Sequence, residues 1–424
     1  MKNFKRTKYA CYTANISMSV VSALSPLLFS TFYSTYGISY SLLGTLVLIN
    51  FFTQLLVDLV FSFYSHKFNL TIVVRVMPAL TVIGLLTYAV FPLFTVGYEY
   101  ISLAVGTVIF SAASGLAEVL ISPIIAAIPA ENPEREMSKL HSIFAWGVVA
   151  VILISSLYLF LFGDKYWQFL VFILAAIPAV SFLLFLRAEI PLQRPEKPTE
   201  KKNPILKNRA ILMCVFCIFL GGASECTMSQ WCSMYLEKAL HIPKIYGDIF
   251  GVAMFSVMLG LGRTLYAKFG KNIYKILLLS SIGAFGCYVV ASLVDVPLIG
   301  LFACGFTGFC TAMLWPGTLI MAADVCPTGD VTMYALMAAG GDFGASVAPQ
   351  FVGVITDGML KNPAAEKLAA RLGVGTEQLA MKSGFVFASL FPLLAIVCFS
   401  LMCKRHKRIE KKKMIYIGEG GAQQ

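Results

Sequence analysis

The sequence is dominated by long apolar stretches separated by short polar segments. Such stretches recur about twelve times along the 424 residues, and most reach the roughly 20 residues that a helix needs to cross a bilayer. The pattern therefore predicts an all-α membrane protein with twelve transmembrane helices. The expected helices cover residues 9–36, 40–64, 72–94, 101–128, 142–162, 167–187, 210–236, 248–267, 274–294, 297–323, 331–356 and 382–403.

The first apolar stretch resembles a signal peptide only in its position. It begins near Tyr9, continues far beyond the usual length of such a peptide, and carries Asn15, Ser22 and Ser25. We interpret it as the first membrane helix.

Composition divides the chain into two similar halves. Six helices precede the segment 194–204, in which proline and charge exclude a membrane helix, and six follow it. We predict a first six-helix bundle at 1–187, a cytoplasmic linker at 188–209, a second bundle at 210–403 and a basic tail at 404–424. Two six-helix halves joined in this way are typical of parallel-repeat transporters.

The formal net charge of +11 is distributed unevenly along the chain. When the N-terminus is placed inside, 26 of the 33 Lys and Arg residues fall in inner segments and 7 in outer loops. This bias predicts a multi-pass protein of the plasma (inner) membrane with both termini in the cytoplasm. The basic charge follows the bilayer surfaces, so we expect lipid as the partner and no nucleic acid.

The sequence offers no motif for covalent or metal chemistry. The eleven Cys residues are scattered, and Cys214 and Cys217 have neither a His nor a second Cys pair nearby. Nucleophile and nucleotide motifs are also missing from the sequence. We expect no enzyme activity, no cofactor and no metal.

Glu118 is the most informative single residue, because it lies within the apolar stretch 101–128. A charge at the membrane centre costs roughly 3 to well over 10 kcal/mol. Ser111, Gly115 and Ser122 share its helix face, which is therefore small and polar. Glu118 either belongs to a functional cavity or is a protonated residue that hydrogen-bonds in a helix interface.

Other polar and aromatic side chains interrupt the predicted helices. Helix 40–64 carries a polar stripe at i, i+4 and i+8, and helix 210–236 carries an acid, an amide and a tryptophan within two turns. An aromatic face can stack on a sugar or a cation, although membrane tryptophans also serve in packing. We predict that protons bind at Glu118, Glu225 and Asp342, and that the substrate contacts Asn50, Gln54, Asp58, Glu118, Glu225, Gln230, Trp231 and Trp315.

The charges inside the predicted helices limit the type of substrate. Several acids are interior, whereas no Lys or Arg lies at a helix centre, and Arg263 lies near an inner end. An anion would need an interior cation to replace its lost hydration. A neutral or cationic substrate is therefore expected, and interior carboxyl groups suit proton coupling.

The halves, the topology and the linker make the chain resemble the major facilitator superfamily over nearly its full length. The inner-loop signature of that superfamily is degraded after the second helix, and better preserved after the eighth, at Lys268, Gly270 and Lys271. The resemblance implies two six-helix bundles around a central cavity.

A narrower resemblance links the chain to the fucose–galactose–glucose proton symporter branch. The matching positions are Glu118, Pro123, Leu140 to Ile143, Glu225 with Trp231, Gly262-Arg263, Trp315-Pro316, and Pro349 with Gly353 and Asp357. This resemblance implies that Glu118 belongs to the proton and sugar site. The first helix departs from the branch, because it has Asn15 and no acid. The glycine–proline run of drug antiporters is missing from helix 142–162.

These observations together predict secondary active transport of a small, neutral, sugar-like solute by a monomer, as proton-coupled uptake with alternating access. The first alternative is proton-coupled export of cationic or amphipathic compounds. A transporter-like receptor that binds without cycling is a further alternative.

Overall fold

The computed structural model describes residues 4–130, 133–191, 208–326 and 331–420, and these residues form helices and no strands. Most of the predicted linker, 192–207, lies outside the described residues. The first half contains α1 (Lys5–Leu27), α2 (Phe29–Tyr36), α3 (Tyr40–Tyr64), α4 (Leu70–Val90), α5 (Glu99–Ala127), α6 (Pro133–Phe162) and α7 (Trp167–Leu186).

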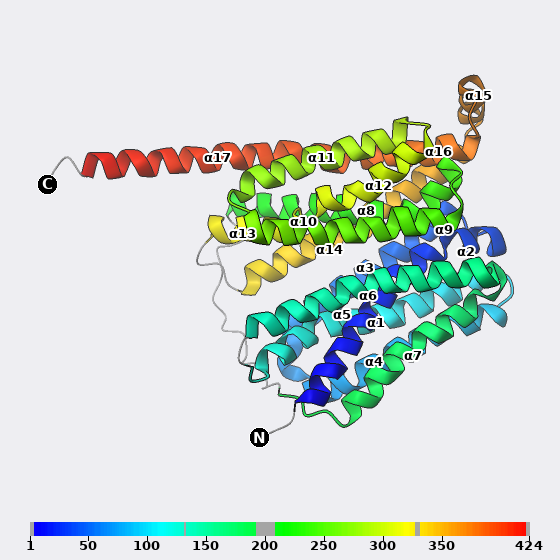
Figure 1. Ribbon diagram of the computed structural model, residues 1–424, viewed down its shortest axis with the longest axis horizontal. Coiled ribbons are helices and arrows are strands. Elements are labelled where there is room, and N and C mark those ends of the chain that lie inside the picture. Colours follow the sequence, from blue (N-terminus) through cyan, green and yellow to red (C-terminus); the bar gives the residue numbers. More distant parts are fainter. Residues whose placement is uncertain (1–3, 131–132, 192–207, 327–330, 421–424) are drawn as a thin grey trace.

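The second half begins with α8 (Arg209–Leu240) and ends with a helix that extends well beyond the bundle (Figure 1). Its helices are α8, α9 (Lys244–Gly247), a π-helix (Asp248–Ala253), α10 (Met254–Phe269), α11 (Ile273–Leu293), α12 (Pro297–Thr311), α13 (Pro316–Val325), α14 (Val331–Leu360), α15 (Pro363–Leu372), α16 (Thr376–Ala388) and α17 (Leu390–Gly420). The basic tail predicted at 404–424 thus continues α17 as a helix as far as Gly420.

Proline accounts for three breaks inside predicted membrane helices. Pro26, Pro316 and Pro392 lack the N–H that would bond to the carbonyl four residues earlier. Each lies beside a helix break: the α1–α2 pair bends by 46°, and the chain also interrupts its helix between α12 and α13 and between α16 and α17. The apolar pattern of the sequence predicts each of these three segments as one continuous helix, and the breaks correct that prediction.

Ten helices of the described residues are long and apolar enough to cross a membrane, or eleven when the bent α1–α2 pair counts as one span. The predicted helix at 331–356 exists as α14, but it is not among these spans. Its sequence includes Gly340, Gly341, Asp342 and Gln350. α14 packs against both α3 and α8 and exposes only part of its surface, which includes Phe343 and Phe351, so it does not need an apolar surface on every side.

Glycines bring α14 close to helices in both halves. A Cβ atom at Gly344 would lie 2.1 Å from the carbonyl oxygen of Phe219 in α8. At the other end of α14, a Cβ atom at Gly353 would lie 2.2 Å from the carbonyl oxygen of Tyr40 in α3. Only glycine permits either approach, so α14 connects its own half to the other half through direct backbone packing.

The two bundles meet at one end and diverge toward the other (Figure 1). They meet on the side where α2, α9 and α16 lie, and they separate toward the beginning of α1 and the end of α13. The side-chain hydrogen bonds described below that join the halves lie at this meeting end, which we call the closed end. A large cluster of buried apolar residues spans both halves and includes Phe29, Tyr40, Trp231 and Val352.

Candidate functional site

The polar stripe of α3 packs against the small face of α5, which runs parallel to it. The Ser111 hydroxyl donates to Asn50 Oδ1 over 2.6 Å, and Gln54 Nε2 donates to the same oxygen over 3.0 Å. One turn further, a Cβ atom at Gly115 would lie 3.2 Å from the Gln54 Cα atom. This register brings Asp58 and Glu118 to the same level. Asn50 is buried and engaged in this contact, so it holds α3 against α5 in this conformation.

Three carboxyl groups approach one another where the halves face each other. Asp58 interacts electrostatically with Glu118, and Asp342 in the opposite half interacts with both. Asp342 is buried, whereas Glu118 is exposed within a 29-residue span that ends at Ala127. Because Glu118 lies near an acid of the other half, its exposed surface faces the space between the bundles.

The surroundings of these three acids leave their charge uncompensated by protein cations. None of the ion pairs among the described residues involves Asp58, Glu118 or Asp342. Asp58 Oδ1 is buried and has no hydrogen-bond partner in the described part of the chain. A group of carboxyls in this state can hold a proton or attract a cation. Within the described residues, no three Asp, Glu, His or Cys side chains converge closely enough to hold a metal ion.

Glu225 lies apart from this group and has a basic partner that the sequence analysis assigned to a helix end. Arg263 of α10 reaches Glu225 of α8, with 3.3 Å between Arg263 Nη2 and Glu225 Oε1. Arg263 Nε also donates to the Ala312 carbonyl oxygen over 3.1 Å. A cation is therefore present beside the second-half acid, on a side chain that is 45% exposed. Position along a helix did not reveal it, because the long side chain carries the charge away from its own Cα atom.

Trp315 lies beside this pair, at the break between α12 and α13. A Cβ atom at Gly341 would lie 2.5 Å from the indole, and one at Gly222 would lie 3.0 Å from it. The ring therefore rests on two glycines of α14 and α8, three residues along α8 from Glu225. It is half-buried, so part of its surface is available for contact with a ligand.

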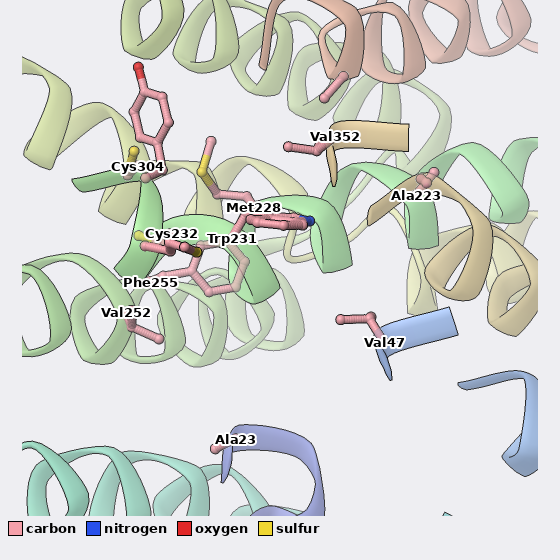
Figure 2. Close-up of a cluster of buried hydrophobic side chains, with 14 of the residues drawn as sticks. Ala23, Val47, Ala223, Met228, Trp231, Cys232, Val252, Phe255, Cys304 and Val352 are labelled. Atoms are coloured by element: carbon pink, nitrogen blue, oxygen red, sulfur yellow. The ribbon is translucent and has the colours of Figure 1, made fainter. Parts of the chain in front are cut away.

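Gln230 and Trp231 occupy a different place in the molecule. The Trp231 ring is fully buried, and its Nε1 donates to the Pro349 carbonyl oxygen over 2.8 Å. Figure 2 shows this ring among buried apolar side chains that include Met228 and Phe255. Gln230 Nε2 lies 3.5 Å from the Ser22 carbonyl oxygen in the first half. In this conformation both residues hold the closed end together, and their predicted contact with substrate would require that end to open.

Three further acids, which the site prediction did not include, join the halves at two places at the closed end. Asp357 accepts hydrogen bonds from the backbone N–H groups of Tyr40 and Ser41 over 3.1 and 2.7 Å, and from the Ser41 hydroxyl over 2.5 Å. It thereby caps the first turn of α3 from the opposite half. The Tyr40 hydroxyl donates to Glu377 over 2.5 Å.

Asp248 makes the second connection, at the start of the π-helix. It is fully buried and accepts hydrogen bonds from Ser233 and from Ser156 of the first half, the latter over 2.9 Å. Lys244 Nζ lies 3.7 Å from the same carboxylate. Asp248 stands at the first position of a predicted helix, where an acid commonly faces solvent, so the sequence pattern gave no sign of this burial.

Comparison with known proteins identifies the architecture. A model of the Major Facilitator Superfamily matches residues 10–349. The fold is similar to that of a D-xylose–proton symporter (17% identity, TM-score 0.68, 91% of this chain and 96% of that chain). It is also similar to the POT family transporter PepTSo (11% identity, TM-score 0.72, 96% and 99%) and to the fucose:proton symporter FucP of E. coli (14% identity, TM-score 0.55, 93% and 99%). Identities this low show the shared fold alone. A comparison with curated proteins gives no match.

Proposed function

Because this chain belongs to the major facilitator superfamily, we propose that it moves a small neutral solute across the plasma membrane by alternating access, as proton-coupled uptake. The observation that carries the proposal is the group formed by Asp58, Glu118 and Asp342, which combines acids of both halves inside the helical bundles. Protonation of such a group changes the electrostatic repulsion between the halves. Proton binding and the relative position of the bundles are thereby coupled.

The cycle would alternate between the conformation described and one in which the closed end has opened. Opening requires Asp357 to leave the first turn of α3 and Asp248 to part from Ser156. Binding of the uncharged solute would favour closure of the open end. Release of the proton from the acid group would then return the protein to its starting conformation. This sequence of events involves no covalent step.

Transport in proteoliposomes with an imposed pH gradient would test the proposal. We expect radiolabelled sugars, polyols or nucleosides to accumulate when the solute side is acidic, and accumulation to stop when a protonophore removes the gradient. Solute accumulation that is the same with and without the protonophore would contradict proton coupling.

One observation favours a second candidate, the export of cationic compounds. The three acids of the group have no ion-pair partner among the described residues, so an organic cation would complete their charge. The same vesicles distinguish the two functions. Movement of tetraphenylphosphonium in the direction opposite to the protons, with no movement of neutral solutes, would favour export.

The proposed orientation places the linker 188–209 and both termini in the cytoplasm, with α15 outside, in a monomeric protein. A membrane-impermeant thiol reagent should then label a Cys introduced at an exposed position of α15, such as Lys367, in intact cells. It should not label one placed at 194–204. The reverse pattern would invert the assignment.

A further inference from the structure

The contact between Arg263 and the Ala312 carbonyl is a consequence of the break between α12 and α13. In a continuous helix this carbonyl would accept the N–H of residue 316, but Pro316 has none. The carbonyl oxygen is therefore free within its own helix. Arg263 Nε donates to it over 3.1 Å.

Gly262 makes this contact sterically possible. A Cβ atom at Gly262 would lie 2.6 Å from the Ala312 Cβ atom and 3.2 Å from the Phe309 carbonyl oxygen. The absence of a side chain lets α10 approach the end of α12 closely, and it places the next residue, Arg263, beside the free carbonyl. By contrast, a Cβ atom at Gly260 would meet nothing within 4 Å.

The guanidinium of Arg263 therefore has two partners in two different helices. Nε is bound to the end of α12, and Nη2 is bound to Glu225 Oε1 over 3.3 Å. The planar guanidinium fixes the angle between these two bonds. The other carboxylate oxygen, Glu225 Oε2, is buried and has no hydrogen-bond partner among the described residues.

We propose that Arg263 is a positioning residue, which is anchored on the carbonyl freed by Pro316 and holds Glu225 with one oxygen occupied and the other, buried in this conformation, left unpaired for a hydroxyl group of the solute to reach when the bundles move. Trp315 lies beside the pair and supplies an apolar face for the same solute. A molecule with adjacent hydroxyls and an exposed C–H surface fits this combination. The role of Glu225 toward the solute rests on the proposed function, whereas the anchoring of Arg263 does not.

The anchoring can be tested without any solute by carboxyl labelling with dicyclohexylcarbodiimide. This reagent attacks protonated carboxyls in apolar surroundings, and an ion-paired carboxylate is protected from it. Arg263→Gln should increase labelling of Glu225, identified by peptide mass spectrometry, by about tenfold, the factor associated with one hydrogen bond to a charged group. Gly262→Ala retains the arginine but displaces its anchor, and it should increase labelling by about threefold.

Gly260→Ala is the matched control, because it adds the same methyl group to the same helix in open space. It should leave the labelling of Glu225 as in the original protein, and none of the three variants should alter the labelling of Glu118. Equal labelling of Glu225 in the original protein, Arg263→Gln and Gly262→Ala would overturn the inference. If Gly262→Ala does not fold, Arg263→Gln against Gly260→Ala still decides whether Arg263 protects Glu225.

Transport then tests the connection to the solute. For a sugar or nucleoside that the vesicles accumulate, Gly262→Ala should raise KM several-fold with little change in the maximal rate, and Gly260→Ala should change neither. If labelling of Glu225 increases but KM does not change, Arg263 anchors Glu225, but Glu225 does not bind the solute. A failure of every solute to accumulate would contradict the proposed function but not the labelling result.

Discussion

Two sets of carboxylates lie between the halves, and they differ in how completely their hydrogen bonds are satisfied. At the closed end, Asp357 accepts three hydrogen bonds from α3, and Asp248 has two serines and a lysine around it. Away from the closed end, Asp58, Glu118 and Asp342 are near one another and in none of the described ion pairs. Because a buried carboxylate without donors is costly and Asp342 is buried, we propose that the second set responds to protons or ligands, whereas the hydrogen-bonded first set stabilises one conformation.

The largest effect should come from neutralising the set formed by Asp58, Glu118 and Asp342. With one proton per solute, a pH gradient of one unit can sustain at most about tenfold accumulation. Glu118→Gln keeps the shape but cannot titrate, so accumulation should fall to equilibrium while solute exchange continues. The measurement compares net uptake with counterflow in proteoliposomes.

Glu366→Gln serves as the control for Glu118→Gln, because Glu366 is exposed on α15, away from the acid group. It should accumulate solute as the original protein does. If Glu118→Gln still accumulates solute in a pH-dependent way and to the original level, Glu118 does not couple protons to transport. The proposed difference in function between the two sets of carboxylates would then be wrong.

A smaller effect should come from weakening the closed end. Asp357→Asn removes the negative charge at the first turn of α3, an interaction worth about 1 kcal/mol. The population in which the closed end is open should then rise roughly fivefold. Double electron–electron resonance between spin labels at Thr35 and Lys361 would measure it as a longer distance.

Asp164→Asn is the matched change at the same end of the first half, where the residue begins a short 3₁₀ helix (Asp164–Tyr166). It should leave the distance distribution unchanged. A distribution that is identical in Asp357→Asn as well would mean that this carboxylate does not hold the two halves together.

The smallest effect concerns a carboxylate outside the membrane. Glu136 lies 3.1 Å from Lys8 and 3.3 Å from Lys139, and the Lys8 bond, followed by those from Tyr12 and Lys139, holds its pKa below the ordinary 4.5. A lowered pKa means that the stabilisation is present above the ordinary pKa and is lost as the pH falls through the lowered value. Glu136→Gln should therefore reduce Tm by about 2 °C or less at neutral pH, and the difference should vanish in strong acid and in high salt.

Thermal unfolding of detergent-purified protein at several pH values would measure this difference. A destabilisation by Glu136→Gln that persists at acid pH would show that packing, and not charge, is the contribution of Glu136.

The sequence was sufficient for the positions of most helices, but not for the breaks before α2, α13 and α17 or for most of the site. Apolar length predicted where the helices lie, because bilayer thickness acts on each segment separately. The neighbourhood of Asp58 and Glu118 depends on the register of α3 against α5, which Asn50, Ser111 and Gly115 set through tertiary contacts. No periodicity within one helix contains that information.

The same limit explains why the sequence analysis overlooked Arg263 and Asp248. Arg263 was assigned by the position of its Cα atom, whereas its charge lies near Glu225 on another helix. The neighbouring Gly262 and the later Pro316 were visible in the sequence. Their joint role, which is to place Arg263 on the Ala312 carbonyl, depends on the contact between α10 and α12.

The glycines of α14 carry a consequence for the genetics of this protein. Gly344 and Gly353 approach a carbonyl oxygen at nearly the same distance, 2.1 and 2.2 Å from the position of a Cβ atom. Gly344 faces α8 in its own half, so alanine there disturbs a contact that every stage of the cycle retains, and the phenotype would be loss of folded protein. Gly353 faces α3 in the other half, so alanine there disturbs a contact that the cycle must itself break. Its phenotype would be a stable protein with a shifted resting conformation, and second-site suppressors would map to the opposite half.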